Sequence, residues 1–284
     1  MFKKLTFFAL VALVAASCSK SQNQTLVPVN VHVNDFRITV DTFSDTKALT
    51  GVESYSGVKA LTLAFYDSNN TQAYKATQMK GDSGFGNFSL NLAPGSYTMV
   101  VLGYTLYDGD VFSLTSPTLA AFTTDCRETF ASTEQVTVEG TALNLSATLD
   151  RVVAKLMVAS TDGRPEGVAR IRMGFSAGNK SFNPTTGLAT SNTSFSNTVK
   201  VSAEVGTNTS SICYLFLSTD EQDINVTIEA LDSENNVLYQ RIVTGVPFKR
   251  NRCTKLTGSV YSVSASAGSF QLNADWEDEV GVTF

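Results

Sequence analysis

The chain has 284 residues, of which 43% are hydrophobic and 17% charged, and its 26 acidic and 21 basic side chains give a formal net charge of −5. This slightly acidic balance, in which no basic cluster exceeds Lys249-Arg250-Asn251-Arg252, argues against a nucleic-acid-binding protein. The single histidine, His32, gives no basis for a Ser-His-Asp or Cys-His catalytic arrangement.

The start of the chain has the layout of an export signal. A short basic beginning precedes an apolar stretch, residues 5–16, which is too short to span a bilayer because a spanning helix takes about 20 residues. Small residues then lead into Cys18, as in a bacterial lipobox, with Ala15 where a large aliphatic residue is usual. We therefore predict a lipoprotein signal peptide at residues 1–17, lipidation of Cys18 and a flexible polar tether at residues 18–26.

The first strand is predicted from valines at every second position between Val27 and Val33. The phase of this alternation slips at Asn34-Asp35, which indicates either a β-bulge or a tight hairpin turn, and apolar residues resume at Phe36. Residues 42–55 are polar and are predicted to form an irregular loop.

Several further strands are predicted in the first half of the chain. They lie at residues 58–66, 88–92, 97–104 and 143–149. A turn signal at residues 67–70 ends the first of them, and the Pro-Gly turn between the second and third predicts that these two form a β-hairpin. One short helix is expected at residues 116–126.

The second half of the chain repeats this pattern. Its predicted strands lie at residues 152–158, 212–217, 224–228, 237–242 and 255–261, followed by a small-residue linker at 262–269. The turn at residues 232–236 gives the clearest hairpin signal. Successive strands with hardly any helix between them favour antiparallel sandwiches over βαβ units. We predict an all-β fold with two tandem antiparallel β-sandwich domains, residues 27–150 and 151–284.

The residue types that carry chemistry form no recognisable site. His32 falls on the polar side of its strand and is expected to be exposed. The thiols at Cys126, Cys213 and Cys253 lack metal-ligand spacing, and we favour three isolated thiols over one disulfide bond, which an exported protein could form. The acidic run after Trp276 lacks the spaced oxygen ligands of a calcium loop. The sequence therefore predicts a protein that is not an enzyme, with no metal site and no cofactor.

A set of short motifs follows the strand pattern along the chain. They are the lipobox at Cys18, Asp45-Thr46-Lys47-Ala48, the strand–turn–strand of residues 90–104, residues 149–155, 214–217, 225–228 and 246–252, and Asp275-Trp276-Glu277. In this order and spacing they resemble the fimbrillin superfamily of the Bacteroidetes over essentially the whole mature chain. The resemblance implies two transthyretin-like β-sandwich domains and a place in surface fimbriae.

The resemblance also implies a mode of assembly. Stalk subunits of that superfamily are cut after a basic residue, lose their first strand and receive a strand from the next subunit, which is β-strand addition, whereas anchor subunits keep the first strand and the lipid. Arg37 and Lys47 are the candidate processing positions here, with Lys47 expected in an exposed polar loop, and ordinary surface charges are the alternative. Val280, Val282 and Phe284 alternate at the C-terminus and form either a donor strand or the final strand of the second domain.

We therefore expect a lipid-anchored fimbrial structural subunit, of the minor or anchor type rather than the stalk type because residues 42–55 contain no arginine. The expected location is the outer membrane, with the protein exposed at the surface as part of a fimbrium. The expected partners are other fimbrial subunits through strand exchange, the membrane through the lipid and, in adhesion, a host surface ligand. The alternative is a glycan-binding surface lipoprotein without fimbrial assembly, in which Trp276 stacks on the sugar.

Overall fold

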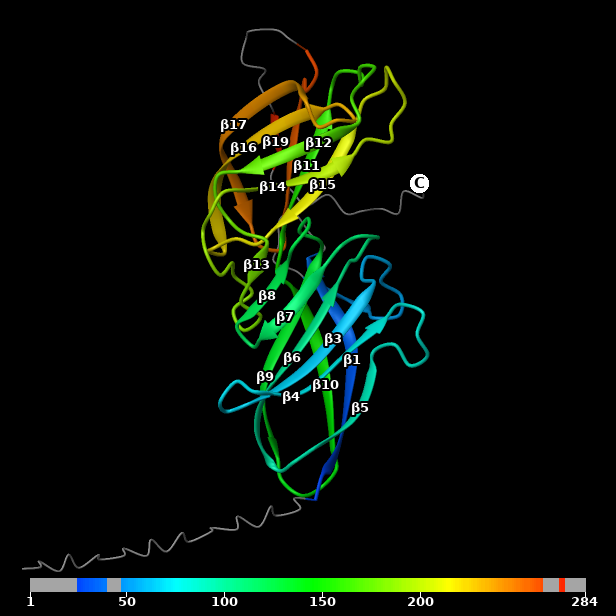
Figure 1. Ribbon diagram of the computed structural model, residues 1–284, viewed down its shortest axis with the longest axis vertical. Coiled ribbons are helices and arrows are strands. Elements are labelled where there is room, and N and C mark those ends of the chain that lie inside the picture. Colours follow the sequence, from blue (N-terminus) through cyan, green and yellow to red (C-terminus); the bar gives the residue numbers. More distant parts are fainter. Residues whose placement is uncertain (1–24, 40–46, 263–270, 274–284) are drawn as a thin grey trace, which may run out of the picture.

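The computed structural model describes residues 25–39, 47–262 and 271–273, and these residues form β-strands joined by turns and loops (Figure 1). No helix occurs in the described part of the chain. It follows that none of the described segments is a helix of the length and apolar character needed to cross a bilayer. The prediction of an all-β fold is confirmed.

Eight strands before residue 152 form one extended sheet. They are β1 (Val27–Thr39), β2 (Lys47–Gly51), β3 (Ala60–Asp67), β4 (Gln72–Met79), β5 (Asn87–Leu92), β6 (Gly95–Tyr104), β9 (Thr129–Val138) and β10 (Leu143–Arg151). The order is β2-β1-β10-β9-β6-β3-β4, with β5 also paired to β1. The sheet folds over one core, to which β1, β5 and β10 contribute from one side and β3, β6 and β9 from the other.

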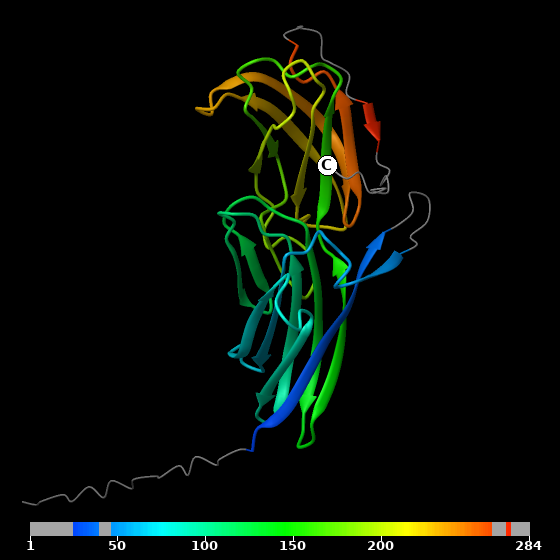
Figure 2. The same cartoon turned by 90° about the vertical axis from the view of Figure 1, so that its right-hand side faces the viewer.

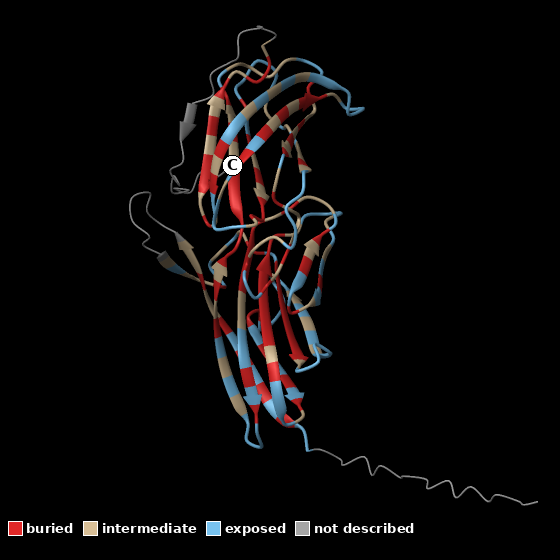
Figure 3. Ribbon diagram, turned by 90° about the vertical axis from the view of Figure 1, so that its left-hand side faces the viewer, coloured by how far each residue is buried: buried red, intermediate tan, exposed pale blue. Residues whose placement is uncertain are grey.

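Two four-stranded sheets follow in the chain. One contains β11 (Ala154–Ser160), β15 (Ser210–Leu215), β18 (Cys253–Gly258) and β19 (Gln271–Asn273), and the other contains β12 (Arg170–Phe175), β14 (Phe195–Lys200), β16 (Glu221–Leu231) and β17 (Val237–Lys249). Their inner faces share a second core that includes Met173, Leu215, Ile228 and Leu256. Figure 3 shows the resulting alternation of buried and exposed residues along the strands.

A small sheet combines strands that come before residue 150 in the sequence with one that comes after it. It contains β7 (Phe112–Ser116), β8 (Leu119–Phe122) and β13 (Ser181–Phe182), and it packs on a third core where Phe182 stacks on Phe216 with ring centroids 4.2 Å apart. In the two views of Figures 1 and 2 this sheet lies at the waist of an elongated molecule. Because β13 comes after residue 150 and its partner β8 comes before it, the division into domains at residue 150 stays a prediction.

The helix predicted at residues 116–126 is wrong. The segment contains β8, which pairs with β7 in a hairpin that brings the rings of Phe112 and Phe122 to a centroid distance of 4.7 Å. Leu114, Ala120 and Phe122 are buried against the third core. The segment forms a strand because this conformation directs alternate side chains to the face that packs on the third core.

Two predictions about the first half of the chain are also wrong. Residues 88–104 do not form a hairpin, since β5 pairs with β1 while β6 lies between β3 and β9. The strand β6 is buried on both faces over most of its length and needs a neighbour on each edge, whereas β5 alternates between exposed and buried residues. The loop predicted at residues 42–55 contains the strand β2, which pairs with the end of β1.

Candidate functional site

The first strand, β1, occupies a slot between other strands of its sheet. Its N-terminal part pairs antiparallel with β5, from Val27 opposite Leu92 to His32 opposite Asn87, and its C-terminal part pairs with β2. The opposite edge of β1 runs parallel to β10. Because β1 is hydrogen-bonded along both edges, its removal would leave the edges of β5 and β10 open to another strand.

Five apolar side chains of β1 fill the first core. Val27, Val29, Val31, Val33 and Phe36 are each at most 3% exposed. Full burial of a valine or phenylalanine side chain is worth about 1.5–3 kcal/mol, so together they contribute on the order of 10 kcal/mol. Since the whole net stability of a domain is about 5–15 kcal/mol, the first half of the chain depends on a strand in this slot.

A β-bulge keeps these side chains on one face. The register of β1 against β10 shifts between Val33 and Asp35, so the sequence alternative of a bulge is confirmed and β1 runs on as one strand. The N–H of Val33 donates to the carbonyl of Gly86 (2.8 Å), and the carbonyl of Asn34 accepts from Val52 (3.1 Å). The extra residue brings Phe36 back to the core, where its ring lies 4.7 Å from that of Phe130.

The outer face of β1 is polar. Asn30 donates from Nδ2 to Oδ1 of Asn144 on β10 (3.0 Å) and accepts from the hydroxyl of Ser89 on β5 (2.9 Å). His32 is exposed, as predicted, and Nδ1 of its ring lies 2.7 Å from Oδ1 of Asn87. The valine alternation therefore separates a core face from a face that links β1 to both neighbouring strands.

Both candidate processing residues lie in the β1–β2 hairpin. Arg37 is the eleventh residue of β1, and its guanidinium forms an ion pair with Asp150 on β10 (2.9 Å). Lys47 is the first residue of β2 and lies opposite Thr39, so its expected place in a polar loop is wrong. Of the other predicted sites, Cys18, Val280, Val282 and Phe284 lie outside the described residues, as does Trp276.

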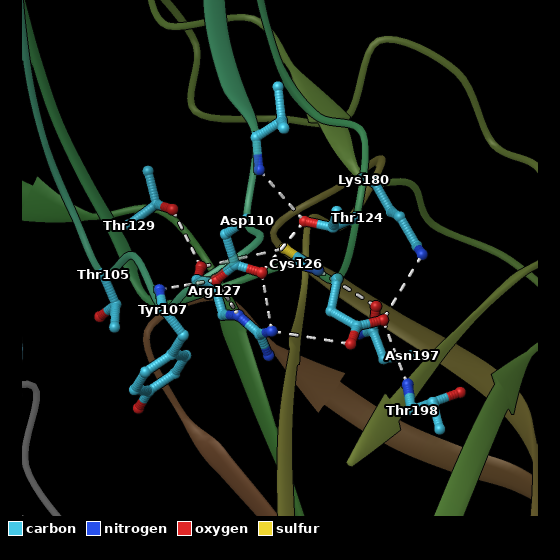
Figure 4. A network of polar contacts seen from close by, with 12 residues as sticks. Thr105, Tyr107, Asp110, Thr124, Cys126, Arg127, Thr129, Lys180, Asn197 and Thr198 are labelled. Atoms are coloured by element: carbon cyan, nitrogen blue, oxygen red, sulfur yellow. Dashed lines mark hydrogen bonds and ion pairs between the residues drawn. The ribbon is translucent and has the colours of Figure 1, made fainter. Parts of the chain in front are cut away.

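A polar network near the waist of the molecule was missed by the sequence analysis (Figure 4). Arg127 makes two hydrogen bonds to Asp110, at 2.7 and 2.9 Å. Burial tends to raise the pKa of Asp110, but the hydrogen bonds from Arg127 and from the Tyr107 N–H outweigh it, so this pKa lies below its ordinary value. The neighbouring Asp125 accepts a hydrogen bond from the Thr198 N–H (3.1 Å).

The same network reaches the third core through a buried amide. The side chain of Asn197 accepts from the Cys126 N–H (3.1 Å) and donates to the Tyr214 carbonyl (2.7 Å). The residue is 1% exposed, so these bonds offset the cost of burying its amide. The charges of residues 125–128 were the signal in the sequence. Asp110 is only 17 residues from Arg127, but Asn197 and Thr198 are 71 and 73 residues from their partners Cys126 and Asp125, so no local pattern indicated those contacts.

A buried ion pair joins the end of β10 to the start of β9. Nη2 of Arg151 lies 2.7 Å from Oε1 of Glu128, whose carboxylate also accepts a 2.7 Å hydrogen bond from the Tyr55 hydroxyl. Burial lowers the pKa of Arg151, but the negative charge of Glu128 outweighs this effect and raises the pKa. Burial and the same carboxylate raise the pKa of Tyr55. The arginine stays charged and lies over the ring of Phe130.

The cysteines of the described chain are structural. Cys126, Cys213 and Cys253 are buried and none of them forms a disulfide bond, which confirms the preference for three thiols over one disulfide. Burial raises the pKa of the Cys126 and Cys213 thiols, so both are protonated and unreactive at neutral pH. No group of three or more His, Cys, Asp or Glu side chains in the described residues has the geometry to hold a metal ion.

The comparisons with known proteins give a family and a set of similar folds. The model of DUF6562, a family of unknown function, matches residues 28–283. No curated protein matches the sequence. The fimbrial anchor protein Mfa2 from Porphyromonas gingivalis is similar in structure at 12% identity and a TM-score of 0.47, over 87% of this chain and 98% of that chain.

Two more solved structures show similarity at the same level. The tip fimbrial protein Mfa3 from Porphyromonas gingivalis has 14% identity and a TM-score of 0.40, over 89% of this chain and 100% of that chain. A candidate adhesin from Bacteroides ovatus has 13% identity and a TM-score of 0.49, over 78% of this chain and 83% of that chain.

Proposed function

This chain belongs to DUF6562, a family of unknown function, and on that premise we propose that it is a lipid-anchored structural subunit of a surface fimbria, of the anchor or minor type. It acts through assembly and adhesion rather than catalysis. The lipid on Cys18 holds it in the outer membrane with the folded part exposed at the surface, and residues 27–150 and 151–284 act as two sandwich domains.

The observation that carries this proposal is the slot of β1. The strand is paired on both edges and places five apolar side chains in the core, so the slot fits an extended segment with apolar residues at alternate positions. A subunit that keeps its own β1 has a filled slot and accepts no further strand there. A subunit that has lost β1 offers the slot to a neighbour, which is β-strand addition.

Retention of β1 therefore separates the anchor role from the stalk role. Cleavage after Arg37 would remove Val27, Val29, Val31, Val33 and Phe36 with the lipid, and cleavage after Lys47 would remove all of β1. With β1 retained, the protein accepts no strand from another subunit, so it is the subunit at which the fimbria ends at the membrane. Its own C-terminal residues Val280, Val282 and Phe284 have the alternation that a neighbouring subunit's slot would accept, and we assign them the donor role.

Mass spectrometry of the mature N-terminus tests the proposal. The protein is purified from outer membranes of its native host, and we expect an N-terminal Cys18 that carries acyl chains, with β1 intact. A mature N-terminus at Ile38 or Ala48 would overturn the anchor role in favour of the stalk role. A Cys18→Ala variant is the matched control, and we expect it to be found outside the membrane fraction and the cells to shed or lose their fimbriae.

A further inference from the structure

A polar cavity of about 710 Å³ lies between segments from the first half of the chain and segments from the second half. Its walls come from residues 131–133 of β9, residues 150–152 at the end of β10, the loop 184–187, residues 220–221 and the β17–β18 turn at 249–252. The volume falls within the range of about 300–1,000 Å³ that is typical of small-molecule sites. The strand β1 contributes no lining residue, although Asp150 of β10 borders both the cavity and the slot of β1.

The lining has an unusual balance of polar groups. It contains four basic and three acidic side chains, four hydroxyl side chains, no aromatic ring, and only Ala131, Val152 and Pro184 as apolar residues. An anionic ligand would meet three carboxylates, so charge does not favour it. A protein partner would need an apolar pocket for an anchoring side chain, and this lining offers none.

The polar groups are held in place by their own contacts. Nη1 of Arg250 donates to the Thr186 carbonyl (2.8 Å), and Nη2 lies 2.7 Å from Asp220. A Cβ at Gly187, where φ is +73°, would lie 2.7 Å from Nη1 of Arg250 and 2.8 Å from Val152, so only glycine lets these side chains approach the loop. The guanidinium is therefore fixed between the loop and the carboxylate.

The two carboxylates remain accessible to a ligand. Asp220 and Glu221 have side chains that are each 68% exposed, although Asp220 pairs with Arg250 and Glu221 pairs with Lys249 (2.8 Å). Each carboxylate has acceptor sites beyond the one used in its ion pair. Acceptor sites of both carboxylates thus lie beside the donor groups of Arg250 and Lys249.

We propose that this cavity binds a neutral carbohydrate. Adjacent hydroxyl groups of a sugar donate and accept hydrogen bonds at once, and they match a wall that combines carboxylates, guanidinium groups and hydroxyls with little net charge. Binding comes from hydrogen bonds to Asp220, Glu221 and Arg250 and not from ring stacking, because no aromatic side chain lines the cavity. This site would give a surface subunit a ligand of its own, independent of strand exchange.

A glycan array followed by calorimetry tests the proposal. The full chain, purified in detergent, is applied to an array of neutral oligosaccharides that also carries sulfated and sialylated ones, and the best neutral glycan is then titrated in solution. We expect neutral glycans to bind, and Asp220→Asn and Glu221→Gln each to weaken binding by about tenfold or more. The matched control is Glu234→Gln, an exposed carboxylate in the β16–β17 turn, which should leave binding unchanged.

Three results would overturn this assignment. They are binding of no neutral glycan, binding of the charged glycans alone, and equal binding by the wild type and both cavity variants. Because Asp220 and Glu221 are exposed, their substitution should leave the thermal unfolding midpoint almost unchanged, and that measurement separates loss of the site from loss of the fold.

Discussion

Arg37 on β1 and Asp150 on β10 form an ion pair across a parallel strand pair, with 2.9 Å between Nη1 and Oδ2, although they are 113 residues apart in the chain. The ion pair therefore links β1 to β10, the strand that borders the slot on its parallel side. The side chains of Arg37 and Asp150 are 38% and 44% exposed, so water screens the attraction between them.

The first prediction concerns the strength of this pair. We expect Arg37→Ala to lower the free energy of unfolding by less than about 1 kcal/mol in urea denaturation, since exposed ion pairs are worth at most about that much. Asp150→Ala should give a loss of the same size, and the double variant should lose little more. A loss of several kcal/mol from Arg37→Ala alone would show that the pair, rather than the buried valines, holds β1 in its slot.

The second prediction concerns protease access to the β1–β2 hairpin. Arg37 lies in a strand that is paired on both edges, whereas Lys47 is the first residue of β2, the edge strand of the sheet. We expect brief trypsin treatment of the folded protein to cut after Lys47 before Arg37, as read by N-terminal mass spectrometry. Lys47→Gln should abolish the early cut. Early cleavage after Arg37 in the wild type would contradict this order.

The third prediction tests the packing of Phe36 against β6. A Cβ at Gly103 would lie 2.8 Å from the Phe36 ring, so Gly103→Ala should cost about 1–3 kcal/mol of stability through overpacking. The cost should shrink when Phe36→Leu is also present, which a double-mutant cycle measures. Gly174→Ala on β12 is the control, because its nearest neighbour would be 3.5 Å away. Equal costs at Gly103 and Gly174 would refute the contact.

The fourth prediction concerns the buried pair of Glu128 and Arg151. The two side chains are 8% and 4% exposed, and loss of one partner leaves the other charge buried. We expect Glu128→Ala to destabilise the protein by about 3–5 kcal/mol in chemical denaturation. Glu128→Leu combined with Arg151→Met should recover much of that loss. If Glu128→Ala costs no more than the exposed pair variant Glu221→Ala, the buried pair carries no such penalty.

The fifth prediction concerns the pH dependence of stability. The pKa of Asp110 is lower in the folded protein than in the unfolded chain, where an aspartate has a pKa of about 3.9. Its contribution is therefore complete above that value and is lost as the pH falls through the lower folded pKa. Between about pH 5 and pH 2, the free energy of unfolding should fall more steeply for the wild type than for Asp110→Asn. Asp108→Asn, an exposed neighbour, should follow the wild type.

Local pattern was a good guide where a strand pairs with its neighbour in sequence. The β16–β17 hairpin follows from the turn at residues 232–236, where Asn235 adopts a φ of +72° that asparagine tolerates. The same logic failed at residues 88–104, because a Pro-Gly turn shows that the chain reverses but not which strand it then pairs with. The helix at residues 116–126 failed for a related reason, since short apolar runs fit either a strand or a helix.

The sequence by itself determined that the chain is built of strands and which side chains of β1 are buried, because the alternation of side chains along a strand has a period of two and is a local property. Only the tertiary structure decided the partners. That β1 lies parallel to β10, that Asn197 accepts a hydrogen bond from the Cys126 N–H, and that a polar cavity forms beside Arg250 all depend on contacts between segments far apart in the chain. Once the cores are packed, each open strand edge and each buried polar group needs a hydrogen-bond partner. The partner is chosen among segments from the whole chain, so a local sequence pattern does not identify it.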